Sequence, residues 1–185
     1  MSSKTHPPAI ISAFGSSLPL PGSEDYELAR TIGETLAKAG FQVMSGGYGG
    51  VMAAVSQGAA AAGGHVIGIT CKQIERLGER AANRYLSEEI RYDTLDERVH
   101  HLIEQADGYV ICSGGLGTLH EIATVLEWMR VGKIPRRPVV CRSSFWLPLL
   151  REIMASPYIP AGDRSLIQFA DSQEQMLQHL ANCRL

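Results

Sequence analysis

The sequence predicts a single α/β domain with a Rossmann-like, doubly wound parallel sheet of about six or seven strands flanked by helices. Three observations carry this prediction. Short, continuously apolar runs alternate with segments whose apolar residues recur at helical spacing. Three of the turns that lead from a strand to a helix are rich in glycine or serine. No internal repeat or linker divides residues 1–185, a length that suits one domain.

The apolar runs are predicted to be strands because they are short, apolar throughout and bounded by turn residues. In chain order they are residues 9–14, 41–44, 65–70, 90–92, 108–112, 138–141 and 166–169. The polar segment 72–88 has no clear period, and we expect a mobile loop there with room for one helical turn.

The helical segments are recognised by apolar residues three and four positions apart and by their end signals. The first begins at Ser23 with Glu24 and Asp25 in its first turn, and Gly40 ends it. The predicted helices are residues 23–39, 51–62, 95–106, 118–130, 145–154 and 172–181.

Composition excludes several classes of protein. A formal charge of −2 without a basic stripe argues against a nucleic-acid or anionic-membrane partner. No apolar run is long enough for a transmembrane helix, and residues 1–8 lack a signal-peptide core and are expected to be a frayed lead-in. The four cysteines lie far apart without a Cys-x-x-Cys pair, which favours buried thiols in a cytoplasmic protein and no metal site.

The three glycine- or serine-rich turns, residues 15–17, 45–50 and 113–118, each follow a strand. In a parallel sheet they meet at the carboxyl edge, where ligands of open α/β sheets bind. Free N–H groups and the helix dipole favour an anion there, and glycine allows close approach of a phosphate. Tight packing is the alternative reason for glycine in such turns. The candidate phosphate- or nucleotide-binding residues are Ser16, Ser17, Gly46, Gly47, Ser113, Gly114, Gly115, Gly117 and Thr118.

The spacing of these turns favours a mononucleotide. The first strand is followed by Gly-Ser-Ser rather than by the Gly-x-Gly-x-x-Gly of dinucleotide-binding proteins, and the chain lacks the Gly-Lys-Ser/Thr of a P-loop.

Two charged residues flank the third turn. Glu121 lies one helical turn beyond Thr118, and Arg98 lies near the start of the preceding helix. The alternative to a functional role is that Glu121 is only a first-turn glutamate favoured by the helix dipole and that Arg98 is a solvated or structural arginine. Beside a bound phosphate, the carboxylate could stabilise an oxocarbenium-like centre or activate water, and the guanidinium could assist a leaving base.

Residues 113–121 match the pattern Pro-Gly-Gly-x-Gly-Thr-x-x-Glu at every defined position except the first, and Arg98 lies 15 residues before Ser113. The turns at residues 14–17 and 46–52 and the strand at 64–68 follow the same pattern in order. In these motifs, over about residues 9–155, the chain resembles the LOG-type phosphoribohydrolases, often called possible lysine decarboxylases.

The resemblance implies hydrolysis of a nucleoside 5′-monophosphate, AMP or an N6-modified adenylate, to base and ribose 5-phosphate. It implies that Arg98 and Glu121 are the catalytic pair, that the turn at 113–118 holds the phosphate, and that the protein is a homodimer without a cofactor. No lysine lies in an evident pyridoxal-phosphate setting, so the decarboxylase label has no support in the sequence. Ser113 replaces the family's proline, and residues 71–89 do not resemble the usual substrate loop, which leaves the base open.

A non-enzymatic carrier or sensor of a nucleotide or of molybdenum cofactor is the main alternative, because related Rossmann-like proteins bind such ligands. Retention of both Arg98 and Glu121 favours chemistry over binding alone. A DNA-processing relative is disfavoured by the acidic balance of charge.

Overall fold

The structure, a computed structural model, describes residues 7–76, 78 and 81–184. Most of the expected lead-in, residues 1–8, therefore lies outside the described residues. Its last two members, Pro7 and Pro8, are exposed and belong to no helix or strand.

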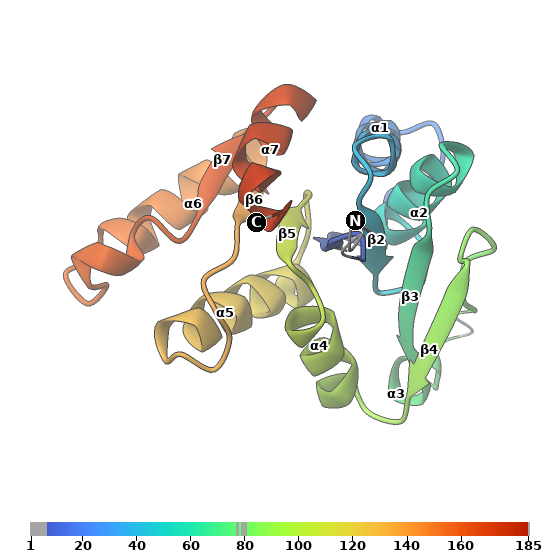
Figure 1. Cartoon of the computed structure of the whole chain (residues 1–185). Coiled ribbons are helices and arrows are strands. Elements are labelled where there is room, and N and C mark those ends of the chain that lie inside the picture. The colour runs from blue at the N-terminus through green and yellow to red at the C-terminus, as the bar shows by residue number, and fades with distance from the viewer. Residues whose placement is uncertain (1–6, 77, 79–80, 185) are drawn as a thin grey trace, which may run out of the picture.

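A parallel sheet of seven strands forms the centre of the molecule, in the order β4-β3-β2-β1-β5-β6-β7 (Figure 1). Every neighbouring pair of strands is parallel, which confirms the predicted fold class. The strands are β1 (Ile10–Phe14), β2 (Gln42–Ser45), β3 (Val66–Cys71), β4 (Glu88–Tyr92), β5 (Gly108–Ile111), β6 (Val139–Arg142) and β7 (Gln168–Ala170).

The helices alternate with the strands and begin close to the predicted positions. They are α1 (Glu24–Lys38), α2 (Val51–Ala61), α3 (Lys72–Glu75), α4 (Leu95–Glu104), α5 (Leu116–Arg130), α6 (Ser143–Ala155) and α7 (Gln173–Leu180), with short 3₁₀ turns at Ala161–Asp163 and Ala181–Arg184. The single turn of α3 lies in the polar segment where one helical turn was expected. Helices α5 and α6 begin two residues earlier than predicted, because hydrogen bonding, and not side-chain periodicity, sets a helix end.

Two apolar cores lie on the two faces of the sheet. Helices α1, α2 and α7 pack on one face around Leu36, Val43 and Val55. Helices α4, α5 and α6 pack on the other, where Leu102, Ile111 and Trp146 are buried. Figure 1 shows α1 and α2 on the opposite side of the strands from α4 and α5. Burial on both faces explains why the strands are apolar throughout.

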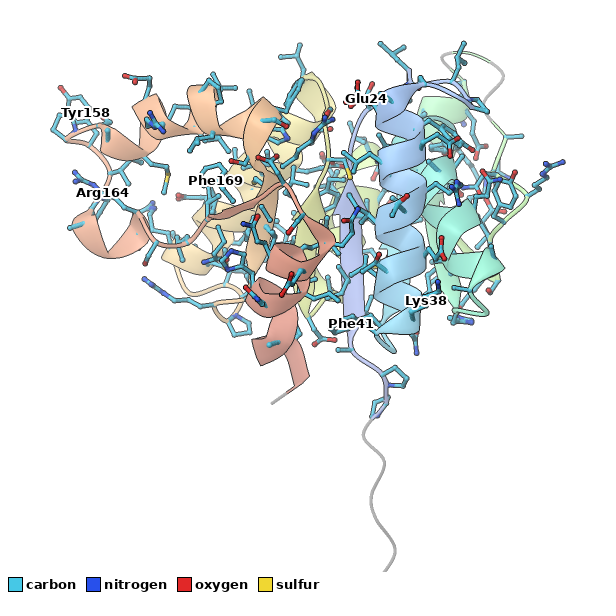
Figure 2. All side chains as sticks on the ribbon, turned by 90° about the horizontal axis from the view of Figure 1, so that it is seen from above. Glu24, Lys38, Phe41, Tyr158, Arg164 and Phe169 are labelled. Carbon is cyan, nitrogen blue, oxygen red and sulfur yellow. The ribbon has the colours of Figure 1, made fainter. Side chains whose placement is uncertain are left out.

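The register brings the ends of three strands to one level. Ala13 of β1 pairs with Ser45 of β2, and Phe14 pairs with Ile111 of β5. The chain leaves β1 toward β2 on one side and returns to β5 on the other, so a topological switch point lies between β1 and β5. Helix α1 runs antiparallel to the strands, with Glu24 at this carboxyl edge and Lys38 at the other (Figure 2).

No helix among the described residues has the length and apolar character needed to span a bilayer.

Candidate functional site

A cleft of about 400 Å³ opens at the switch point, at the carboxyl edge of the sheet. The predicted turns at 15–17 and 113–118 and the predicted pair Arg98 and Glu121 all contribute to its walls. Its lining residues are Gly15, Ser16, Ser17, Leu18, Tyr48, Met52, Ile74, Arg98, Gly115, Gly117, Thr118 and Glu121.

Backbone hydrogen bonds join the three turns to one another. The Ser16 N–H donates to the Ser113 carbonyl at 2.9 Å, and the Val51 N–H donates to the Ser16 carbonyl at 2.8 Å. Gly50, the residue before Val51, has a φ of +65°, and a Cβ at this position would come within 2.6 Å of the Ser17 Cα. Glycine is needed at this position both for the left-handed backbone and for the close approach of the two turns.

The start of α5 supplies an anion-binding surface. Gly115 precedes the helix, and no acidic residue lies in its first turn. The first N–H groups of a helix have no intrahelical acceptor, so those of residues 116–118 are available to a ligand. The Thr118 side chain is 3 % exposed and packs under Gly114, where an added Cβ would come within 2.6 Å of the Thr118 Cβ. This packing fixes the turn against the helix.

Arg98 lies in the first turn of α4, held there by a capping box between Thr94 and Glu97. Its guanidinium is buried and donates from Nε to the Ile69 carbonyl at 2.7 Å and from Nη2 to the Gly46 carbonyl at 3.2 Å. Its Cζ lies 5.6 Å from the centre of the Tyr48 ring, a cation–π distance. Among the described residues Nη1 has no hydrogen-bond partner, so it can donate to a ligand in the cleft.

Glu121 lies one turn into α5 and faces the same cleft. Burial raises the pKa of its carboxyl to about 7, although the Arg98 guanidinium acts in the opposite direction. Within the described part of the chain the carboxyl has neither a hydrogen-bond nor an ion-pair partner. A carboxyl poised near neutrality can both accept and return a proton at physiological pH.

Four predicted residues lie behind the cleft instead of lining it: Gly46, Gly47, Ser113 and Gly114. Gly46 supports Arg98, because its carbonyl accepts from the guanidinium and a Cβ there would overlap Nη2. The Ser113 hydroxyl is directed at side chains of α1 and β6.

Asn83, in the polar segment before β4, anchors the second turn. Its Nδ2 donates to the carbonyls of Gly47 and Tyr48 at 3.1 and 3.2 Å, and its backbone N–H donates to Gly47 at 2.8 Å. The part of the polar segment around Asn83 is thus tied to the site by hydrogen bonds. A lone asparagine in a segment without a period carries no signal in the sequence.

Sequence reasoning also missed the apolar wall of the cleft, formed by Leu18, Tyr48, Met52 and Ile74. Tyr48 and Met52 lie within the second glycine motif and could have been found from it. Leu18 and Ile74 follow no motif, and only the fold brings them to the cleft.

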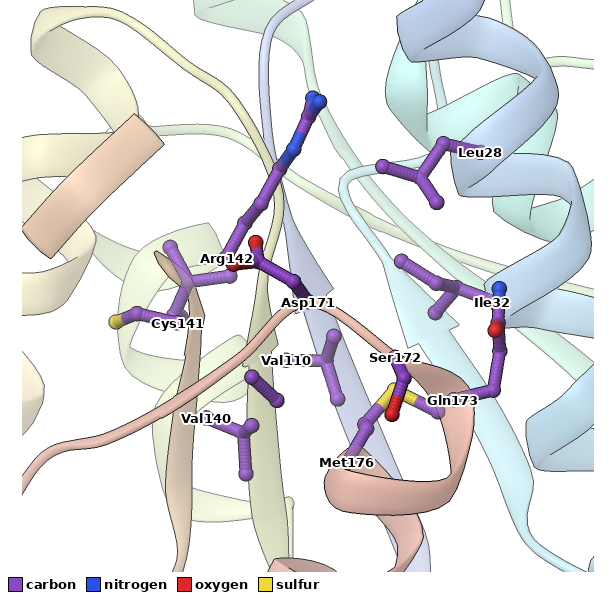
Figure 3. Close-up of a pocket in the computed structure, with 12 residues that line it drawn as sticks. Leu28, Ile32, Val110, Val140, Cys141, Arg142, Asp171, Ser172, Gln173 and Met176 are labelled. Atoms are coloured by element: carbon purple, nitrogen blue, oxygen red, sulfur yellow. The ribbon is translucent and has the colours of Figure 1, made fainter. Parts of the chain in front are cut away.

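None of the predicted site residues lines three further cavities among the described residues. One of about 30 Å³ lies between α1, the ends of β5 and β6 and the start of α7, and its lining is mostly apolar (Figure 3). Among the described residues no three His, Cys, Asp or Glu side chains are grouped as a metal site requires.

The family model described as "possible lysine decarboxylase" matches residues 52–180, which include Arg98, the signature turn and Glu121. The chain belongs to this family, the LOG family. Several relatives carry a different name.

Three relatives show the extent of the similarity. A probable cytokinin riboside 5′-monophosphate phosphoribohydrolase of rice, LOGL9, is 27 % identical over 143 residues, which are 75 % of this chain and 62 % of the rice protein. The cytokinin riboside 5′-monophosphate phosphoribohydrolase of Rhodococcoides fascians is 27 % identical over 79 % of this chain and 74 % of its own. A protein of Archaeoglobus fulgidus is 34 % identical over 63 % of this chain and 74 % of its own. The match thus spans less than two thirds of the rice protein.

Solved structures of similar fold include TM1055, a structural-genomics target, with a TM-score of 0.75 at 28 % identity over 94 % of this chain and 99 % of that one. The molybdenum cofactor binding protein of Rippkaea orientalis has a TM-score of 0.72 at 21 % identity over 98 % and 99 % of the two chains. At that identity the likeness concerns the fold alone.

Proposed function

We propose that this LOG-family protein is a phosphoribohydrolase that cleaves the N-glycosidic bond of a nucleoside 5′-monophosphate, AMP or an N6-modified adenylate. The observation that carries the proposal is Glu121. A half-buried, unpaired carboxyl with a pKa raised to about 7 faces the cleft beside a guanidinium and one turn from a helix start suited to phosphate.

The residues divide the work as follows. The N–H groups at the start of α5 and the Thr118 hydroxyl bind the 5′-phosphate, which places the ribose over the first turn of the helix. The Glu121 carboxylate stabilises positive charge at C1′ and accepts a proton from the attacking water. The C1′–N bond breaks, the hydroxyl goes to C1′, and the water proton accepted by Glu121 passes to the leaving base, which restores the carboxylate. Arg98 Nη1 donates to the departing base.

Glu121 is the one carboxylate among the described residues that line the cleft. Glycosidases that use two carboxylates pair a general acid with a base or nucleophile. Because a second carboxylate is lacking in this lining, we assign assistance of the leaving group to Arg98.

The decisive experiment measures release of ribose 5-phosphate from AMP and other monophosphates by the native protein and by Glu121→Gln. We expect a loss of about 100-fold or more in kcat for this variant, since general base and charge stabilisation each contribute at that scale. Glu127→Gln, on the same helix but exposed and paired with Arg130, is the matched control and keeps its activity. The proposed enzymatic function is refuted if the native protein cleaves no monophosphate, or if Glu121→Gln and Glu127→Gln are equally active.

Binding provides an independent check of the phosphate site. Thr118→Val removes a hydroxyl without changing the shape of the side chain, so AMP binding weakens more than adenosine binding. Equal losses for the two ligands would show that the phosphate binds elsewhere. A ligand carried through purification without turnover, such as molybdenum cofactor, would favour a carrier.

A further inference from the structure

Ser113, the first residue of the signature turn, is held by side chains from two other elements. Its hydroxyl donates to Asp25 Oδ1 at 3.1 Å and accepts from Arg142 Nη1 at 2.8 Å. Arg142 also forms an ion pair with Asp25. Asp25 lies in the first turn of α1 and Arg142 ends β6. Three segments far apart in the sequence therefore meet at one hydroxyl.

Further hydrogen bonds hold the Arg142 side chain in the position from which it donates to Ser113. Its Nε donates to Ser144 Oγ at 3.0 Å, and the Ser144 N–H donates to Asp171 Oδ1 at 2.9 Å. Figure 3 shows the Arg142 side chain extending away from the apolar residues of the small cavity and past Asp171. The Arg142 side chain is 20 % exposed and that of Asp25 is 42 % exposed, so water screens the pair in part.

The position of Ser113 matters to the cleft because its carbonyl accepts from the Ser16 N–H at 2.9 Å and its next neighbour, Gly114, packs on Thr118. A proline would fix φ at this position through its ring, whereas serine leaves φ free to rotate. We propose that Asp25 and Arg142 are positioning residues that hold Ser113, and through it the turn at the start of α5, in the geometry required for phosphate binding. The proposal rests on the proposed function for the identity of the ligand.

A merely structural ion pair is the alternative, and the two roles differ in their dependence on residue 113. A structural pair stabilises the protein whatever residue occupies 113. A positioning pair becomes dispensable when a proline ring fixes the turn. Within the described residues the Ser113 N–H has no hydrogen-bond acceptor, so Ser113→Pro removes no backbone hydrogen bond.

The test introduces Arg142→Ala into the native chain and into Ser113→Pro. Calorimetry, with Glu121→Gln added to each protein so that AMP is turned over slowly, gives the dissociation constants of AMP and adenosine, and hydrogen exchange gives the protection of the Ser16 amide. In the native chain we expect AMP to bind about tenfold more weakly, adenosine to bind equally, and Ser16 to exchange about tenfold faster. In Ser113→Pro we expect Arg142→Ala to change none of the three.

Arg136→Ala is the matched control, because it removes another arginine–aspartate pair, with Asp163 at 3.1 Å, near the opposite end of β6. It should leave Ser16 exchange and both affinities unchanged. Equal effects of Arg142→Ala in both backgrounds, or unchanged Ser16 exchange in the native chain, overturn the proposal.

A second pair of variants covers the case in which Ser113→Pro does not fold. Asp25→Asn in the native chain should speed Ser16 exchange, whereas in Ser113→Ala, which lacks the hydroxyl, it should add nothing. Additive effects overturn the proposal. The exchange measurement needs no ligand, so failure to bind or cleave AMP refutes the proposed function while leaving this test intact.

Discussion

Replacing Glu121 by glutamine should stabilise the protein, and by an amount that depends on pH. The pKa of this carboxyl is raised by burial from an ordinary value of 4.5 to about 7 in the folded chain. Between these values the folded state binds a proton that the unfolded state has lost. The free energy of unfolding therefore falls as pH rises through this window and levels off above about pH 7. At about 1.4 kcal/mol for each pKa unit, ionisation of Glu121 costs the folded state about 3 kcal/mol.

Glutamine at 121 keeps the shape of the side chain and is neutral at every pH. Urea titrations at about pH 5 and about pH 8 give the free energy of unfolding of each protein. The variant's free energy of unfolding minus that of the native chain should be about 2 to 3 kcal/mol larger at about pH 8 than at about pH 5. A difference between the two proteins that does not change with pH would refute the raised pKa of Glu121.

Glu127→Gln provides the control for this measurement. Glu127 lies on the same helix, but its hydrogen bond to Arg130 lowers its pKa. Its contribution to stability is present above its unfolded pKa and lost as pH falls. Glu127→Gln should therefore show no gain over the native chain between about pH 5 and about pH 8.

Three further predictions follow from the site, and a fourth follows from the family resemblance. The kcat/KM for AMP should rise with pH toward a plateau above about pH 7, because ionised Glu121 is the reactive form; a profile flat from about pH 5 to about pH 9 would contradict this. Gly114→Ala should abolish phosphate binding, since its Cβ would meet Thr118, whereas Gly162→Ala, outside the cleft and with nothing within 4 Å of its Cβ, should retain it in the same calorimetric assay. Asn83→Ala should raise hydrogen exchange in the second turn and lower kcat through Arg98, while equal exchange would show that the anchor is dispensable. Light scattering should give twice the 20.1 kDa chain mass, and a monomer would contradict the expected homodimer.

Much of the fold was predictable because it depends on local pattern. Seven apolar runs and the glycine turns between them are enough to predict a parallel sheet covered on both faces, and the structure has both. The ends of the strands and helices were harder to predict from the sequence. Strand β4 begins at Glu88, two residues before the predicted run, because its pairing with β3 includes Glu88 and Glu89, which are polar and exposed. Backbone pairing at a sheet edge needs no apolar side chain.

In the candidate site, too, the features that depend on local sequence spacing could be predicted, and those that depend on contacts made by the fold could not. The spacing of Arg98, the turn and Glu121 predicts that they share one edge of the sheet, and they line one cleft. The direction of the Arg98 guanidinium is not in that spacing. It depends on the carbonyls of Ile69 and Gly46, which are backbone atoms and would be the same for any side chain that fits. Gly46 leaves room for the arginine, and this supporting role stands beside the phosphate contact predicted at this position, which stays a prediction. Because the added Cβ would displace the guanidinium, we expect Gly46→Ala to impair catalysis as Arg98→Ala does while leaving the affinity for inorganic phosphate unchanged.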